Sequence, residues 1–352
     1  LLAATSLIVG NMIGAGIFVL PASLAKFGGI SILGWICTAT GALVLAKIFS
    51  NFSKLISGKS GGPYLYSKVV FGDFIGFIVA WGYWISCWVN NAAIAVAIVS
   101  ALSFFFPELI TSPISATLTG LAFIWFFTCT SSKGVKSSGN IQIFTTIAKI
   151  IPLLFIIISG MFLFDWNIFP EFNITDQSDF EVFPIVCVMT LYAFLGIESA
   201  TIPANSIKSP SNTIPIATMI GTVISTLIYV FGTIVLFGIL PNEVIVNSPA
   251  PFAEAGEVIG GKYVGYFISA GAAISAIGAL NGWILITSYM PMSMANDKLF
   301  PKVFTKKNKK GSPVVSLIFG SILTSIVMTM NFSQSLVSRF EFLILLTTLS
   351  TL

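Results

Sequence analysis

The sequence contains no histidine and few charged residues. None of its 352 residues is His, and only 9% are Asp, Glu, Lys or Arg. This absence excludes a Ser-His-Asp triad, a His-rich metal site and a His proton relay. No carboxylate pair or Cys cluster at metal-ligand spacing takes their place. We therefore expect a protein that is not an enzyme and that has no bound metal and no cofactor.

Cysteine is also scarce. The four cysteines, at positions 37, 87, 129 and 187, all lie in apolar runs rather than in loops. A disulfide framework is not expected from this placement, and we interpret the four residues as small packing side chains.

Apolar residues are abundant instead, because 56% of the chain is hydrophobic and the mean hydropathy is +0.97. The apolar runs cover residues 1–25, 30–54, 73–105, 114–131, 139–164, 182–206, 214–240, 263–291, 313–331 and 340–352. All but the last are long enough to cross a bilayer. We predict an all-α polytopic membrane protein with roughly ten spans. The first run lacks the features of a signal peptide, and the chain has neither an initiator Met nor a polar C-terminus, so we expect a fragment of a longer protein.

The loop charges predict an orientation. If the N-terminus is inside, 13 of the 17 basic residues fall on the cytoplasmic side, including the cluster at 298–310. The opposite side receives ten acidic residues and only Lys26, Lys262 and Arg339. This bias predicts a multi-pass protein of the inner (cytoplasmic) membrane with its N-terminus inside. We interpret the basic cluster as a solvated loop beside the bilayer and expect no nucleic-acid partner.

Two distant segments share a pattern of Gly, six residues and then Pro-Ala. They are "IGAGIFVLPAS" at 13–23 and "LGIESATIPAN" at 195–205. Five spans separate them, so the second copy enters the membrane from the opposite side. This is the arrangement of an inverted repeat with one discontinuous helix in each half. The unwound backbone would line a cavity and offer N–H groups to a carboxylate. The two halves would be residues 1–164 and 182–352, together forming one transport domain.

Several side chains suit such a cavity. Tyr83, Cys87 and Asn91 recur at i, i+4 and i+8 and predict one stripe on the third helix. Asn91 could equally bond a neighbouring helix. Trp283 and Tyr192 are aromatic candidates for substrate contact, although a single aromatic residue in a span is more often a packing residue. A stripe of small residues before Trp283 predicts close helix packing; it contains Gly271, Ser275, Gly278 and Gly282.

Two ionisable residues lie within predicted spans. Glu198 falls in the second Gly-Pro segment, where a carboxylate at mid-span costs roughly 2.5–3.5 kcal/mol and is normally paired or directed into a cavity. Lys149 lies some ten residues into the fifth span, too deep for easy snorkelling. We expect functional roles for both residues.

These motifs carry a resemblance to a known family. They are "GNMIGAGIFVLPASLAKFGG" (10–29), "SGGPYLYSKVVFG" (60–72), "YWISCWVNNA" (83–92), "TLYAFLGIESATIPANSIKSPSNTIPIAT" (190–218), "APFAEA" (250–255), and "LNGW" with "ANDKLFPKVF" (280–304). The sequence resembles the basic amino acid/polyamine antiporter branch of the amino acid–polyamine–organocation superfamily. The resemblance implies a five-plus-five inverted-repeat fold, like that of the leucine transporter LeuT. Helices 1 and 6 would be broken, and about ten of an expected twelve helices would be present.

The resemblance also implies roles for individual residues. The substrate's carboxylate and amino group would lie on the backbone at Ile13, Gly14, Ala15, Gly16 and around Leu195, and Asn91 would contact the same head group. Trp283 would stack on a guanidinium or an aliphatic stem, which a cation–π contact favours. Tyr83, Glu198 and Tyr64 would act in gating, and Lys149 resembles a lysine that occupies the sodium position in sodium-independent relatives.

The function implied is sodium-independent exchange of a basic amino acid for a related amine or amino acid by alternating access. Tyr192 stands where the arginine/agmatine members have a gating Trp, which weakens the case for arginine. Lys149 leaves proton-coupled carriage of neutral amino acids open. A channel or a transporter-derived receptor is the alternative from a different class. The expected partners are small amino acid or amine substrates and the lipid bilayer, with a homodimer left open.

Overall fold

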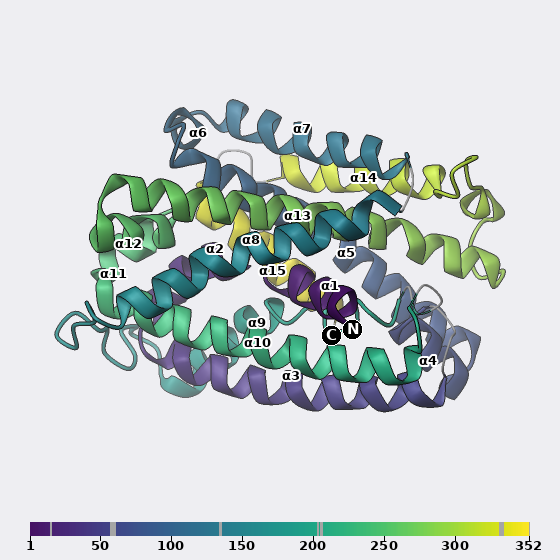
Figure 1. Ribbon diagram of the computed structural model, residues 1–352, viewed down its shortest axis with the longest axis horizontal. Helices are drawn as coiled ribbons and strands as arrows, with labels where there is room; N and C mark the ends of the chain where they lie inside the picture. The colour runs from purple at the N-terminus through teal and green to yellow at the C-terminus, as the bar shows by residue number, and fades with distance from the viewer. Residues whose placement is uncertain are drawn as a thin grey trace.

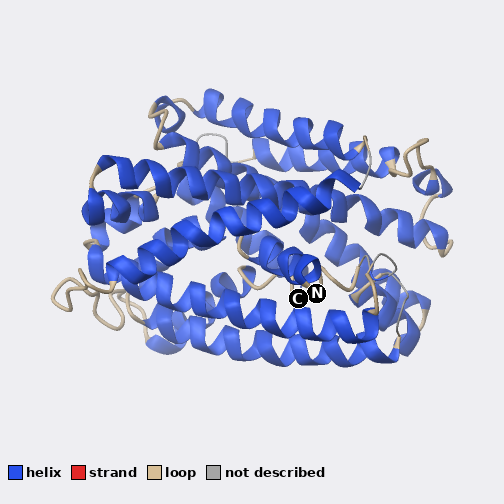
Figure 2. Cartoon of the chain, in the orientation of Figure 1, coloured by secondary structure: helices blue, strands red, loops and turns tan. Residues whose placement is uncertain are grey.

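The computed structural model describes residues 1–14, 16–56, 61–133, 136–202, 204, 207–330 and 334–351, with the backbone alone over 136–142. All regular structure within these ranges is helical, as Figure 2 shows. Most of the long helices run side by side along the long axis of the molecule (Figure 1). The predicted all-α membrane fold is confirmed.

Seven helical stretches of the described chain are long and apolar enough to cross a membrane. The first contains α1 (Leu2–Met12), α2 (Gly16–Leu24) and the 3₁₀ turn η1 (Ala25–Phe27). The other six lie in α3 (Ile30–Leu55), α5 (Asp73–Ser103), α7 (Pro113–Ser131), α8 (Lys136–Gly160), α10 (Pro210–Ile239) and α13 (Lys262–Asn296). Each of these helices coincides with a predicted apolar run.

Three further runs form shorter helices. These are α9 (Asp179–Tyr192), α14 (Val314–Thr329) and α15 (Leu336–Thr351). The run at 182–206 is shortened because α9 stops at Tyr192 and residues 193–202 continue as turns. The connections carry short elements, α4 (Pro63–Phe71), α6 (Glu108–Thr111), α11 (Asn242–Asn247), α12 (Pro251–Gly260) and η3 (Lys302–Thr305).

Both predicted helix breaks are present. The first lies between Met12 and Gly16, where Ile13 and Gly14 leave the helix. Gly14 is required there because a Cβ atom would lie 2.9 Å from the Cβ of Ala279 on α13. The second break follows Tyr192, and Gly196 within it has a φ of +110°, which favours glycine.

The two breaks lie against each other. A Cβ atom at Gly196 would lie 3.2 Å from the Cβ of Asn11, one residue before the end of α1. The Asn11 amide donates a hydrogen bond of 2.9 Å to the Ser199 hydroxyl. The irregular backbone of each half is therefore buried against the other, as irregular backbone within a membrane requires.

The small-residue stripe brings α13 close to α8. A Cβ atom at Gly271 would lie 2.4 Å from Cγ of Pro152, and one at Gly278 would lie 2.5 Å from the Thr145 hydroxyl. Ser275, between them, donates hydrogen bonds of 3.1 and 2.9 Å to the carbonyl oxygens of Ile13 and Gly14. The stripe therefore lets α13 approach both α8 and the first break.

Loops of opposite charge lie at opposite ends of the molecule. In Figure 1 the Lys-rich connection after α13 lies at the right end, which α4 also occupies. The connections through α6, α11 and α12, together with the acidic segment before α9, lie at the left end. The basic loops and the acidic loops are thus separated in the fold, as the charge argument assumed.

Candidate functional site

A narrow cavity lies where the two helix breaks meet, with room for about one water molecule. Its lining comes from four parts of the chain: Asn11, Met12, Gly14 and Gly16 at the first break, Tyr192, Ala193 and Leu195 at the second, Asn90 and Ile94 on α5, and Trp283 on α13. Of the predicted substrate contacts, the structure brings together Gly14, Gly16, Tyr192, Leu195 and Trp283. Ala15 lies outside the described residues.

Trp283 forms the aromatic wall of this cavity. Its side chain is 2% exposed, and its indole N–H donates a hydrogen bond of 3.3 Å to the carbonyl oxygen of Asn11. This bond fixes the indole against the last turn of α1. The ring is therefore held in place before a substrate arrives.

Lys149 lies fully buried beside the first break. Its ammonium nitrogen donates hydrogen bonds of 2.7 Å to the carbonyl oxygens of Gly10 and of Ile13. Helix breaks leave such carbonyls without intrahelical partners. The Lys149 side chain therefore supplies a donor to both carbonyls. The Ile13 carbonyl points to Lys149 and Ser275, and Ile13 does not line the cavity.

Glu198 lies in the second break and is 6% exposed. Its carboxylate accepts a hydrogen bond of 2.6 Å from the Tyr83 hydroxyl on α5 and one of 3.2 Å from the Gly196 N–H. Tyr83 is the neighbour that the resemblance implies for this acid. The carboxylate is paired rather than turned into the cavity.

Tyr192 is the last residue of α9. Its hydroxyl donates a hydrogen bond of 2.8 Å to the side-chain oxygen of Asn90 on α5. Its ring packs edge-on against Phe340 of α15, at 5.8 Å between centroids. The residue therefore links the second break to α5 and α15.

Asn91 lies outside the cavity lining. Its amide donates a hydrogen bond of 2.9 Å to the hydroxyl of Thr287, one turn after Trp283, and its side-chain oxygen is buried with no partner among the described residues. This is the helix-to-helix contact that the sequence left open as an alternative.

The polar cavity residues that sequence reasoning missed are Asn90 and Asn11, and it also missed the apolar lining residues Met12, Ile94 and Ala193. A helix turns by about 100° per residue, so Asn90, seven residues after Tyr83, lies within about 20° of it, whereas Asn91 lies about 80° away. The spacing i, i+4, i+7 is as helical as i, i+4, i+8, so the sequence alone does not choose between Asn90 and Asn91. Asn11 is a polar residue in the last turn of α1, directly before the break, and that position was its only signal.

Tyr64 lies far from the cavity, at the Lys-rich end. Its hydroxyl donates a hydrogen bond to Asp297, just after α13, and Lys68 forms ion pairs with Asp297 at 2.9 Å and with Asp73 at 3.3 Å. Burial raises the pKa of Tyr64, and the neighbouring Asp297 carboxylate raises it further. Burial also raises the pKa of Asp297, but the bonds from Tyr64 and Lys68 outweigh it and lower the pKa below the usual value.

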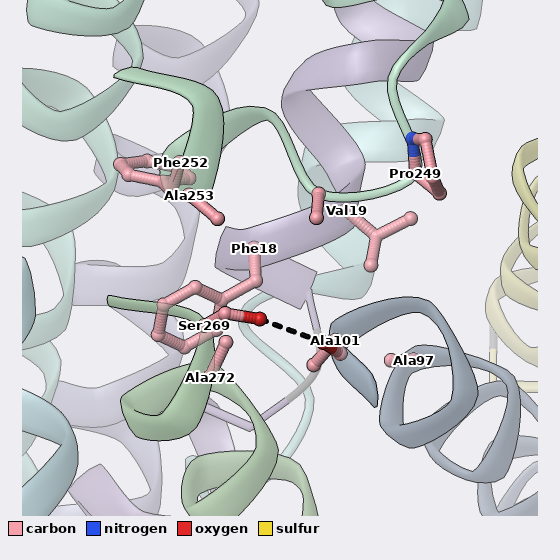
Figure 3. Close-up of a pocket in the computed structure, with 10 residues that line it drawn as sticks. Phe18, Val19, Ala97, Ala101, Pro249, Phe252, Ala253, Ser269 and Ala272 are labelled. Atoms are coloured by element: carbon pink, nitrogen blue, oxygen red, sulfur yellow. Dashed lines mark hydrogen bonds between the residues drawn. The ribbon is translucent and has the colours of Figure 1, made fainter. Parts of the chain in front are cut away.

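A second cavity lies beside α2 and α12 (Figure 3). Apolar side chains dominate its lining, which contains Phe18, Val19, Ala97, Ala101, Pro249, Ala250, Phe252, Ala253, Ser269 and Ala272. The Ser269 hydroxyl donates a hydrogen bond of 2.6 Å to the carbonyl oxygen of Ala101. Nothing in this lining is charged, and Ser269 contributes its only polar side chain.

The arrangement defines a class of protein. Paired helix breaks around a cavity at the centre of a helical bundle characterise secondary transporters with the LeuT-type fold. A solved structure titled as a substrate-bound, outward-open sodium-coupled sialic acid symporter matches with a TM-score of 0.62 and 13% sequence identity, over 93% of this chain and 72% of that one. The fold is therefore that of a LeuT-type transporter.

The chain belongs to the amino acid permease family, whose model matches residues 1–352. Similar relatives include the cadaverine/lysine antiporter of Escherichia coli K12, at 32% identity over 93% of this chain and 73% of the relative. The putrescine transporter PotE of Haemophilus influenzae is 35% identical over 97% and 78%, and a putative arginine/ornithine antiporter of Bacillus subtilis is 31% identical over 95% and 76%. The resemblance to the basic amino acid/polyamine antiporter branch is confirmed.

Proposed function

We propose that this protein is a sodium-independent antiporter that exchanges a basic amino acid for a related amine or amino acid by alternating access. The observation that carries the proposal is the position of Lys149. Its ammonium group donates hydrogen bonds to two carbonyl oxygens at the first break and so supplies a positive charge there without a metal ion. The names of the relatives, which refer to lysine, cadaverine, putrescine, arginine and ornithine, support cationic substrates.

The proposed binding mode follows from the cavity. The N-terminus of α2 begins at Gly16, and its N–H groups offer partial positive charge to an α-carboxylate. Trp283 also lines the cavity, and an indole ring suits an ammonium or guanidinium group. A basic amino acid would place its head group at the breaks and its side chain along Trp283. The narrow cavity would have to widen to admit it.

Further parts of the proposal concern gating and placement. Tyr83 and Glu198 would act at one side of the site, and Tyr64 at the Lys-rich end. The protein would lie in the inner membrane with that end in the cytoplasm, in keeping with the charge of its loops. Residues 1–164 and 182–352 would be the two inverted halves.

A second candidate is a proton-coupled carrier of neutral amino acids. A buried lysine next to the site favours it, because a desolvated ammonium group can exchange protons. The two candidates differ in whether a counter-substrate is required.

Proteoliposomes containing the full-length protein separate the two candidates. The lumen is either empty or loaded with arginine, agmatine, ornithine, putrescine, lysine or alanine, and uptake of radiolabelled arginine, lysine and alanine is measured. Cation uptake that requires an internal cationic counter-substrate supports antiport. Alanine uptake into empty vesicles under a proton gradient supports the second candidate. Tight binding without flux would indicate a receptor, and currents far above carrier turnover would indicate a channel.

Replacing Trp283 by Leu tests the binding mode. We expect weaker uptake of lysine or arginine, by about tenfold, because a desolvated cation–π contact contributes on the order of 1–2 kcal/mol. Alanine should be affected less, since its side chain does not reach the ring. Trp125→Leu, on the exposed face of α7, is the matched control. Equal losses for all substrates would show that Trp283 only packs.

A further inference from the structure

We propose that Asn90 positions the hydroxyl of Tyr192 as a hydrogen-bond acceptor in the cavity, and that this pair selects substrates whose side chain ends in an N–H donor. The inference rests on the proposed function and names the residues that would make it specific for cations. Asn90 acts through Tyr192 and is therefore a positioning residue.

The contacts that carry the inference are buried. Tyr192 and Asn90 are 5% and 3% exposed, and both line the cavity between the breaks. The Tyr192 hydroxyl donates to Asn90 Oδ1 at 2.8 Å. Within the described residues, this is the only side-chain hydrogen bond that either residue forms. The remaining polar capacity of both groups is thus available to a ligand.

The direction of this bond decides what the hydroxyl can recognise. A phenolic hydroxyl has one proton, and Asn90 accepts it, so the oxygen has only lone pairs left. An ammonium or guanidinium group can donate to these lone pairs, whereas a methyl group or thioether cannot. When the bound substrate fills the cavity and excludes water, an apolar chain end would leave the oxygen unsatisfied, and such a mismatch is penalised more strongly than a missing methylene.

The tyrosine ring has little freedom to turn elsewhere. Phe340 packs against its edge with an interplanar angle of 88°. On another side it covers Gly16, where a Cβ atom would lie 3.5 Å from Tyr192 Cε1. The ring is fixed by packing, and Asn90 determines where its hydroxyl proton points.

The test measures competition binding to the purified full-length protein, with arginine, lysine, ornithine and norleucine as probes. Norleucine has an unbranched side chain without an N–H group. Tyr192→Phe and Asn90→Leu should each lower the ratio of cation affinity to norleucine affinity by about tenfold, the size of one hydrogen bond to a charged group. The double variant should lose no more than either single variant, because both act on one hydroxyl.

Two further variants separate positioning from general packing. Asn90→Asp keeps an oxygen that accepts the Tyr192 proton, so it should retain the selectivity that Asn90→Leu loses. Tyr229→Phe is the matched control: its hydroxyl donates to the Ala193 carbonyl at 2.9 Å, and the residue does not line the cavity. Its selectivity ratio should equal that of the wild type.

Unchanged ratios in Tyr192→Phe and Asn90→Leu would overturn the inference, as would additive losses or an Asn90→Asp variant that behaves like Asn90→Leu. Failure of the proposed function gives a different result. If the wild-type protein binds cations better than norleucine but does not exchange them, the antiport proposal is wrong. The inference about Asn90 and Tyr192 is then unaffected. A wild type that prefers norleucine contradicts both.

Discussion

At the scale of single residues, Lys149 combines structure and proposed function. A buried ammonium group is costly unless it is paired, and here the partners are the carbonyl oxygens of Gly10 and Ile13 rather than a carboxylate. Each bond is charge-assisted, and each satisfies an oxygen that the helix break has released. The positive charge also lies beside the break where we propose that a substrate carboxylate binds.

We expect Lys149→Met to lower the free energy of unfolding by about 1–3 kcal/mol. The Gly10 carbonyl loses its side-chain donor and the Ile13 carbonyl keeps only the bond from Ser275, although the cost of burying the ammonium group is relieved. The transport cycle should slow, while substrate affinity stays within an order of magnitude. Thermal midpoints in detergent and initial transport rates measure these effects. Lys47→Met, on the exposed surface of α3, is the control. A variant with wild-type midpoint and transport would remove Lys149 from the mechanism.

At the scale of elements, the close packing of α13 holds the site together. Gly271 and Gly278 let this helix approach α8, and Ser275 and Trp283 on the same helix bond to carbonyl oxygens at or near the first break. A shift of α13 relative to α8 would therefore move the aromatic wall and the break together. Gly271 and Gly278 therefore contribute by letting α13 approach α8, and they bind nothing themselves.

Gly278→Ala should destabilise the protein by about 1–3 kcal/mol and reduce transport. The added Cβ atom would lie 2.5 Å from the Thr145 hydroxyl and 2.7 Å from Thr145 Cβ, so α8 or α13 must move. Gly41→Ala makes the same change on α3, where nothing lies within 4 Å, and should be neutral or slightly stabilising. Midpoints of thermal unfolding compare the two variants. Equal midpoints would contradict tight packing at the stripe.

At the scale of the whole molecule, ion pairs join different elements at both ends of the bundle. Lys26, after α2, pairs with Glu341 of α15 at 2.6 Å at one end. Lys68 of α4 pairs with Asp297 after α13 at 2.9 Å at the other. The cavity lies between these contacts and is narrow. We infer that each contact helps to close one side of the cavity, so alternating access would break the two contacts one at a time.

We expect Lys26→Gln and Asp297→Asn to favour opening at opposite ends. The pairs are partly exposed, so each contributes no more than about 1 kcal/mol, or up to about a fivefold change in population. The measurement is the reaction rate of Leu195→Cys, in the cavity lining, with an impermeant thiol reagent added from each side. Lys54→Gln, exposed on α3, is the control. Faster labelling from the same side in both variants would contradict this scheme.

The contact at the Lys-rich end should not change between about pH 5 and 9. The pKa of Asp297 lies below its usual value of 3.8, so its contribution is present above that value and is lost only as the pH falls through the lowered pKa. The pKa of Lys68 is raised, mainly by its bond to Asp297, so its contribution is lost only at higher pH than usual. The labelling rate, divided by that of Asp297→Asn at each pH, should stay constant. A change near pH 6 would assign the contact to another group.

The sequence by itself determined the membrane class, the family, the two helix breaks and the positions of Lys149, Glu198 and Trp283. These features can be read from short segments: hydropathy over 20 residues, glycine and proline in apolar runs, and charged residues within spans. Each reflects a large free-energy cost within a membrane. Tertiary structure decided which side chains face the cavity. A rotation of about 100° on one helix separates Asn90, which lines it, from Asn91, which bonds Thr287. Packing against Trp283, Tyr192 and the two breaks fixes that rotation, because α5 is largely buried and its many apolar residues give it no strong periodic signal.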